Sequence, residues 1–389
     1  MKTFNKILFL VFILVALSAC EKNTGIDDTT SVDVEIPKHG YIFFNTERPT
    51  TRAALEQGKL LHNFSVIGYS YPAVNDWNTV KVQASQSSHG VFSQTGASQL
   101  VTYAGGVHSY DPLKPWSVTS KYAFFAWYPT EIVDLNTGAT KTVGTTTTPI
   151  EPKDYEGNPY IRYTLPTGTD KDARGRMYDV MTACELDYEK AEGINVPLTM
   201  KHRLAALDVL AISMINPKSL NDAWKLTGDA AYKDNDVITV KVTDMSLKLE
   251  SIKTSVKIPL NTNETTEQLV ASGSATPTYT GFTLGTIPYY TGADNDLVQL
   301  IGADEKLILI PQTEAISATI SLSYQILCNR TPIEKDGKTT FADSETITIN
   351  GLKEGVYHYM LVTFTKSGIL LQAHADESWE EYRVEHEFN

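Results

Sequence analysis

Short runs of apolar and β-branched residues, broken by Gly, Pro, Asn and Asp, make up most of the hydrophobic pattern along this chain. Residues 237–242 and 246–252 alternate apolar with polar positions, which is the period of a strand with one buried and one wet face. Residues 121–128 are apolar almost throughout and stop at Pro129, which indicates the central strand of the first half. Further strands are predicted at 64–71, 100–103, 160–165, 178–183, 196–202, 307–310, 319–326, 346–349, 357–364 and 369–371. Long helical periodicity is nearly absent, so the pattern predicts an all-β chain with two antiparallel β-sandwiches in tandem.

The run at residues 204–212 has two interpretations. Its Ala and Leu content fits a helix of about two to three turns, but its neighbours are strands and we therefore expect a strand. The polar, turn-rich segment 213–236 marks a domain boundary. We expect an N-terminal sandwich at 53–215 and a C-terminal sandwich at 216–389. Loops are expected at 137–148, 171–176 and 261–280.

The first 19 residues have the pattern of an export signal. Lys2 and Lys6 precede an apolar run at 7–15, which is too short to cross a bilayer. Leu-Ser-Ala-Cys at residues 17–20 follows at once and resembles a bacterial lipobox, in which the cysteine is acylated with palmitate-like chains and becomes the new N-terminus. An ordinary signal peptide with a chance cysteine is the alternative. The position of Cys20 directly after the apolar core favours lipidation.

Residues 20–52 have the character of a tether and propeptide. The part just after Cys20 is polar and short of large apolar groups, whereas 41–44 (Tyr-Ile-Phe-Phe) is a strand-like apolar patch. A Thr-Arg-Ala sequence at 51–53 predicts cleavage between Arg52 and Ala53. Arg48 is a weaker candidate because Pro49 follows it. Arg174 and Arg176 are possible competitors, although a cut there would sever the first domain.

Composition and charge narrow the classes of partner. The 389 residues are 42% hydrophobic and 20% charged, ordinary values for a globular protein. The formal net charge of −13 argues against nucleic acid as a partner, because binding to a phosphate backbone requires a basic surface. Of the three cysteines, Cys184 and Cys328 lie far apart in sequence. Two separate thiols are expected rather than a disulfide.

Recognisable catalytic and metal-binding motifs are missing from the sequence. The eight histidines are scattered, and neither Cys-x-x-Cys nor His-Glu-x-x-His occurs. Gly-x-Ser-x-Gly and a phosphate-binding Gly-Lys-Thr loop are absent as well. We therefore predict a chain that is not an enzyme, with no catalytic residues, metal or cofactor.

Four segments in order resemble the fimbrillin-like family of Bacteroidetes, the subunits of type V pili. They are Phe-Ser-Val-Ile-Gly-Tyr at 64–69, Phe-Phe-Ala-Trp-Tyr-Pro at 124–129, Asp-Val-Met-Thr-Ala at 179–183 and Lys-His-Arg-Leu-Ala-Ala-Leu at 201–207. The resemblance extends over most of residues 50–389 and is weaker in the second half. No single motif is decisive, but four in order behind a lipobox are fairly specific.

The resemblance implies two transthyretin-like sandwiches and a lipoprotein precursor exported to the outer membrane and cell surface. It implies a cut after an arginine, which removes an N-terminal strand and opens a groove. A C-terminal segment of another pilus subunit then fills that groove by β-augmentation. The partners would be other subunits in a homo- or hetero-polymer, and, before processing, the outer membrane through lipid at Cys20. An uncut anchor and a tip subunit are variants of the same role.

The C-terminal tail has the pattern of such a donor strand. Tyr382, Val384, His386 and Phe388 alternate with charged residues, so one face suits a groove and one faces water. The donor is expected to begin upstream, near Ile369 or Trp379. The alternative is that the tail completes its own second domain.

A different function is a surface lipoprotein that binds glycans. Aromatic residues in loop-like segments would then form a face on which sugars stack: Trp77, Tyr103, Tyr110 and Trp116.

Overall fold

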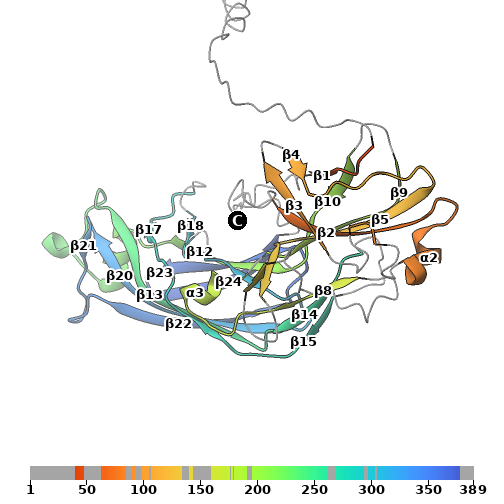
Figure 1. The fold of residues 1–389 in the computed structure, drawn as a ribbon. Helices are drawn as coiled ribbons and strands as arrows, with labels where there is room; N and C mark the ends of the chain where they lie inside the picture. Colours follow the sequence, from red (N-terminus) through yellow and green to blue (C-terminus); the bar gives the residue numbers. More distant parts are fainter. Residues whose placement is uncertain are drawn as a thin grey trace, which may run out of the picture. The chain divides into compact units, whose positions relative to one another are not determined.

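Strands make up most of the chain that the structure describes, which confirms the all-β class. The computed structural model describes residues 40–47, 63–84, 90–92, 98–104, 107–133, 140–142, 159–175, 177, 179–190, 195–261, 269–292, 297–302 and 305–376 (Figure 1). The helices among them are short: α2 (Trp77–Ala84), α3 (Lys171–Arg174), α4 (Pro217–Trp224) and the 3-10 helix η3 (Gly228–Ala230).

A six-stranded antiparallel sheet forms the first half. Its order is β11 (Lys201–His202), β9 (Met181–Glu189), β5 (Ser120–Tyr128), β2 (Phe64–Pro72), β3 (Gln99–Ala104) and β4 (Val107–Ser109). Successive side chains of β5 enter different cores, since Phe125 and Trp127 belong to one hydrophobic cluster and Phe124 and Ala126 to another. Burial on both faces explains why this strand is apolar without alternation. The prediction that residues 121–128 form a central strand is confirmed.

Two larger sheets form the second half, and their inward side chains join one hydrophobic cluster. The first contains β18 (Val298–Gln299), β12 (Ala205–Ser213), β23 (Tyr357–Thr365), β24 (Gly368–Asp376) and β19 (Leu307–Leu309). The second contains β16 (Thr278–Tyr279), β13 (Ile238–Glu250), β20 (Ile316–Cys328), β21 (Thr331–Pro332), β17 (Thr286–Pro288) and β22 (Phe341–Ile349).

The sequence shows two separate alternating runs, at 237–242 and 246–252. In the structure they form the single strand β13. The register against β20 shifts between Val242 and Asp244. A bulge of this kind inserts an extra residue and interrupts the period of two without ending the strand.

The ambiguous run at 204–212 is a strand, as expected. β12 is buried along its whole length and pairs with β23 in a parallel ladder of eight residue pairs. β18 and β19 pair with its other edge. These neighbours satisfy the backbone of an Ala- and Leu-rich segment on both sides, so tertiary pairing decides against the helix that local propensity allows.

Strands from before residue 216 also pair with strands after it. A three-stranded sheet joins β8 (Tyr160–Thr164) to β14 (Ser255–Pro259) and β15 (Val270–Ser272), and β12 lies in the sheet of β23. A further pair is β6 (Glu131–Val133) with β7 (Thr140–Thr142). Because β7 lies within 137–148, the loop predicted there is wrong at residues 140–142. The division into domains at 53–215 and 216–389 stays a prediction.

The loop predicted at 171–176 is wrong for its first four residues. They form α3, because the Asp170 carboxylate caps the helix by accepting a hydrogen bond from the backbone N of Ala173 at 2.8 Å. The loop predicted at 261–280 contains the short strands β15 and β16. Cys184 and Cys328 do not form a disulfide with each other, as predicted.

Candidate functional site

The strand β1 (Phe44–Glu47) comes from the segment predicted to be a propeptide, and it lies inside the folded protein. It pairs in parallel with β10 (Val196–Thr199), with Phe44 opposite Val196 and Glu47 opposite Thr199 (Figure 1). The backbone N of Val196 donates a hydrogen bond to the carbonyl of Phe43 at 2.8 Å. The predicted strand-like patch at 41–44 therefore leads into a strand that begins at its last residue, Phe44.

Phe44 is held by four aromatic rings, which we call the aromatic cradle: Phe64, Phe92, Tyr110 and Phe124. Their centroids lie 6.0, 6.1, 6.0 and 5.3 Å from that of Phe44. Edge-to-face and tilted contacts at this separation are favourable beyond the burial of area alone. Phe44 is 2% exposed, and Ile42 beside it is 0% exposed. The β1 segment thus completes a hydrophobic core rather than lying on its surface.

Backbone bonds fix the residues just before β1. The amide of Ile42 donates to the carbonyl of Lys114 at 2.9 Å, and the amide of Trp116 donates to the carbonyl of Gly40 at 2.8 Å. The hydroxyl of Tyr110 donates to the carbonyl of Ile42 at 2.9 Å. Burial raises the pKa of Tyr110 to about 12, so this hydroxyl keeps its proton and stays a donor throughout the physiological range.

Among the described residues, β10 forms a ladder with β1 and with no other strand. If β1 left, the backbone groups of β10 that face it would lose their partners, and the aromatic cradle would face water. An exposed strand edge beside an apolar trough is a template for another extended segment. The buried side chains clustered around β1 are apolar or aromatic, and the buried ring of His108 packs edge-on against Phe64, with 5.4 Å between the ring centroids. Recognition there would depend on backbone pairing and on the alternation of apolar side chains.

The predicted site residues lie outside the described part of the chain. These are the lipidation residue Cys20, the cleavage residues Arg52 and Ala53, and the donor residues Trp379, Tyr382, Val384, His386 and Phe388. The structure nevertheless places their neighbours. β1 ends at Glu47, five positions before Arg52, and β24 ends at Asp376, directly before the tail. Ile369 lies in β24 and pairs with Phe364 of the same chain.

Sequence reasoning missed the aromatic cradle and gave Tyr110 a different role. Trp77 and Tyr110, two of the four aromatic residues suggested for a sugar-binding face, are 0% and 6% exposed. Tyr103 and Trp116 are partly exposed. The exposed face that the glycan-binding hypothesis requires is therefore not formed by these four residues together. The apolar patch at 41–44, which follows a polar segment, is the signal in the sequence for the site.

Arg174, a possible competitor for proteolysis, is 3% exposed. Its guanidinium donates to the carbonyls of Thr280 and, at 3.0 Å, Gly281, and it lies 4.0 Å from the centroid of the Phe282 ring. Burial lowers its pKa, and the carboxylate of Glu305 acts in the opposite direction. A protease that requires an extended, accessible arginine cannot use this residue in the folded chain. Arg176 lies outside the described residues.

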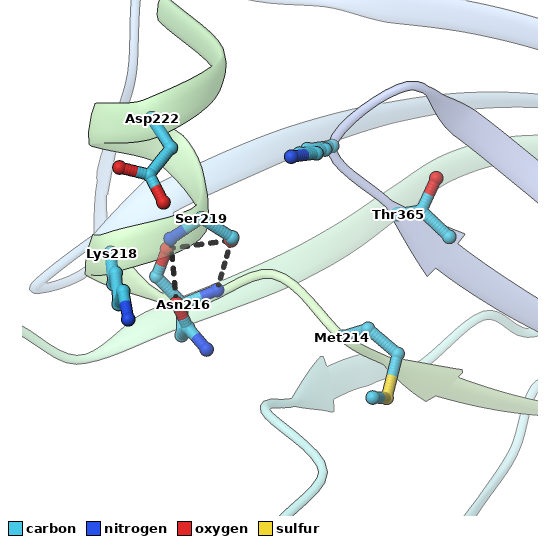
Figure 2. Close-up of a pocket in the computed structure, with 7 residues that line it drawn as sticks. Met214, Asn216, Lys218, Ser219, Asp222 and Thr365 are labelled. Atoms are coloured by element: carbon cyan, nitrogen blue, oxygen red, sulfur yellow. Dashed lines mark hydrogen bonds between the residues drawn. The ribbon is translucent and has the colours of Figure 1, made fainter. Parts of the chain in front are cut away.

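An open pocket of about 310 Å³ lies between α4 and the turn after β23 (Figure 2). The backbone N of Ser219 donates to the Asn216 side chain at 2.7 Å, and the backbone N of Asn216 donates to the Ser219 hydroxyl at 2.9 Å. These groups form a capping box for α4. The remaining lining side chains include Lys218, Asp222 and Lys366, which are exposed. This arrangement is explained by helix capping, and we assign no ligand to it.

The described residues contain neither a metal-binding cluster nor a membrane-spanning helix. No group of three or more His, Cys, Asp or Glu side chains there is placed to hold a metal ion. None of the helices in that part of the chain is long and apolar enough to span a bilayer.

Comparison with known proteins finds a related fold. No family model and no curated protein sequence matches the chain. A fimbrial protein from Bacteroides vulgatus matches its structure with a TM-score of 0.56 and 17% identity, covering 88% of this chain and 100% of the other. A fimbrilin from Porphyromonas gingivalis matches with a TM-score of 0.41 and 10% identity, and the match covers 86% of this chain and 96% of the other. The chain has the fold of a Bacteroides fimbrial protein, in agreement with its resemblance to the fimbrillin-like family.

Proposed function

We propose that this chain is a structural or adhesive subunit of a fibre on the bacterial surface, assembled by strand exchange. The observation that carries the proposal is that β1 completes an apolar core from within the predicted propeptide. The fold of the Bacteroides fimbrial protein supports it. The role is that of a building block that binds other subunits of the fibre and performs no catalysis.

Cleavage between Arg52 and Ala53 would make β1 replaceable. Before the cut, burial of Ile42 and Phe44 stabilises the strand by roughly 2 kcal/mol each, and the chain connection keeps it beside β10. After the cut, β1 belongs to a separate fragment that ends at Arg52. A competing segment can then take its place at little cost, because each new backbone pair replaces an old one.

The C-terminal tail of another subunit is the proposed competitor. β24 ends at Asp376, which leaves residues 377–389 to act as donor. Tyr382, Val384, His386 and Phe388 provide the alternating side chains, with Trp379 upstream. Because ordering a ten-residue segment costs on the order of 10–20 kcal/mol, the donor needs most of its length in the vacated groove.

Lipid at Cys20 would hold the precursor at the outer membrane until that cut releases it. Two or more acyl chains anchor a protein stably, whereas one chain binds only weakly. A Cys20→Ser chain is expected to lose fatty-acid labelling and its place in the membrane fraction. If the wild-type protein carried no fatty-acid label, the proposed anchoring step would be wrong, and strand exchange would be tested separately.

The proposal is tested on the chain that begins at Ala53, prepared by cleaving the full protein. We expect this form to assemble into fibres, and a chain truncated after Glu380 to stay a folded monomer with an unchanged melting temperature. A full-length tail with Tyr382→Ser, Val384→Ser and Phe388→Ser is the matched control for length and should also fail to assemble. Fibres from the truncated chain, or a lower melting temperature of its monomer, would contradict the donor role.

A further inference from the structure

The two ends of the β1 groove lead to different parts of the protein. β10 continues through β11 into β12, so its Thr199 end is the one close to the second half of the chain. Because β1 is parallel to β10, Gly40 lies at the opposite end, near Val196. We call this the far end of the groove. A donor that runs in the direction of β1 enters the groove there.

Two loops at the far end expose apolar side chains to solvent. The amide of Trp116 donates to the carbonyl of Gly40, and the amide of Ala73 donates to the carbonyl of Thr119 at 3.0 Å. These bonds place residues 72–76 and 115–119, the far-end loops, side by side next to the groove entrance. Within them Val74 is 92% exposed and Val118 is 80% exposed.

A partly exposed aromatic stack lies near these valines, among polar side chains that include exposed Asp76 and Thr119. Trp116 is partly exposed and stacks on Tyr188, with 5.7 Å between the ring centroids. The hydroxyl of Tyr188 donates to the carbonyl of Asn195 at 3.4 Å, just before β10 begins. Exposed apolar side chains are common one at a time, but two on neighbouring loops beside a partly exposed aromatic stack indicate a contact surface.

We propose that the far-end loops are the surface on which the body of the neighbouring subunit, a second copy of this chain, rests in the fibre. The proposal rests on the strand exchange proposed above. It adds a contact between folded bodies to the contact made by the donor strand, and it assigns that contact to Val74 and Val118.

The length of the tail requires such a contact. Thirteen residues follow Asp376. A segment that replaces residues 40–47 uses eight of them, so five remain to connect the groove to the donor's body. Five extended residues span at most about 17 Å. The end of β24 in the donor subunit must therefore lie close to the far end of the acceptor's groove, and the two bodies touch there.

The geometry also fits an open chain of subunits. Residue Asp376, where the donor tail starts, pairs with Tyr357 in the second half of the chain, whereas the far-end loops belong to the first half. At each contact, one subunit therefore uses its second half, where the tail starts, and its neighbour uses its first half, where the far-end loops lie. Contacts of this heterologous kind generate filaments when they do not close into a ring. Covering Val74 and Val118 at this contact removes apolar surface from water, which favours association.

The test uses Val74→Glu and Val118→Glu, each made in the full chain and then cleaved after Arg52. Val237→Glu is the matched control, because Val237 is 61% exposed and precedes β13, away from the groove. Both test variants and the control should keep the wild-type melting temperature, since exposed positions tolerate substitution. Fibre growth is followed by light scattering, and binding of a synthetic peptide of residues 377–389 is measured separately.

We expect fibre growth to slow at least tenfold in Val74→Glu and Val118→Glu, with peptide binding unchanged and Val237→Glu equal to wild type. Growth at the wild-type rate in both variants would overturn the body contact and leave strand exchange intact. If both peptide binding and fibre growth were lost in these variants, the body contact would also be overturned, because the loops would then act on the groove itself. A wild-type chain that neither binds the peptide nor grows would overturn strand exchange and this contact together.

Discussion

β1 and β23 both bury aromatic side chains almost completely, but they are held in different ways. Phe44 on β1 is 2% exposed and Phe364 on β23 is 0% exposed. β23 pairs with β12 over eight positions and with β24 over nine. β1 pairs with β10 over four positions, and the bonds made just before it go to a loop and a tyrosine hydroxyl.

How deeply a strand is buried and how easily another segment can replace it are therefore separate properties. Burial decides how much free energy the strand contributes, and both strands contribute strongly. Pairing and connectivity decide whether the strand can leave while the rest stays folded. β23 cannot leave without breaking two long ladders, whereas β1 breaks one short ladder and lies in the segment that ends at the predicted cut.

Phe364→Ala should have the largest effect on unfolding. Its ring packs in the core of the second half, 5.0 Å from that of Tyr324, and truncating a buried Phe costs about 3–5 kcal/mol because a cavity remains. The loss should be equal in the full chain and in the chain that begins at Ala53. It is measured by urea unfolding of both forms.

Phe44→Ala should cost a similar amount, about 3–5 kcal/mol, but in the full chain alone. Once the fragment ending at Arg52 has been replaced by a donor, residue 44 is no longer part of the folded subunit. Urea unfolding before cleavage and after fibre assembly tests this. An equal loss in both forms would mean that β1 stays in place after processing.

His358 on β23 gives the core of the second half its own pH dependence. It is 2% exposed and accepts a hydrogen bond from the backbone N of Lys353 at 3.1 Å. Burial, followed by the charge of Lys353, lowers its pKa to about 4. In the unfolded chain the pKa of His358 is about 6.5, so as the pH falls the unfolded chain binds a proton before the folded chain does. The free energy of unfolding therefore has its full value above pH 6.5 and falls by up to about 3 kcal/mol toward pH 4.

His358→Gln retains an acceptor and removes the titration. The variant should lose most of the decline between pH 6.5 and 4, measured as the free energy of unfolding at a series of pH values. A wild-type slope in His358→Gln would assign the decline to other groups.

Tyr110→Phe should have the smallest effect. The change keeps the ring in the aromatic cradle and removes the hydrogen bond to the carbonyl of Ile42, at a cost of about 1 kcal/mol. After cleavage, the fragment that carries β1 should exchange several times faster than in the wild type. Tyr122→Phe is the control, because its hydroxyl accepts from the amide of Ser117 and does not contact β1. Equal exchange in the two variants would show that the Tyr110 hydroxyl does not hold β1.

The elements that the sequence predicted well are those whose local pattern reports burial directly. β5 is apolar because both of its faces are buried, and β13 alternates because one of its faces is wet. β12 was ambiguous, because Ala and Leu favour a helix and only pairing with β23, some 150 positions away, decides for a strand. The four-residue helix α3 was missed because a single cap, Asp170, specifies it.

The sequence predicted one strand of the candidate site but not the residues that surround it. An apolar patch before Arg52 predicted a strand in the propeptide. Its partner β10 lies 152 positions away, with Phe44 opposite Val196, and no local pattern connects the two. For the same reason Tyr110 was interpreted as a surface aromatic residue, although β1 covers it.

Native mass spectrometry of a chain that is truncated after Glu380, so that it lacks its own donor tail, and then cleaved after Arg52 tests the central claim most directly. The sample is measured alone, with a synthetic peptide of residues 377–389, and with a scrambled peptide of the same composition. We predict that the fragment ending at Arg52 stays bound in the first and third samples. In the second it leaves, and one peptide binds to each remaining chain of 328 residues (53 to 380). A fragment that stays bound while the peptide remains free would contradict the account.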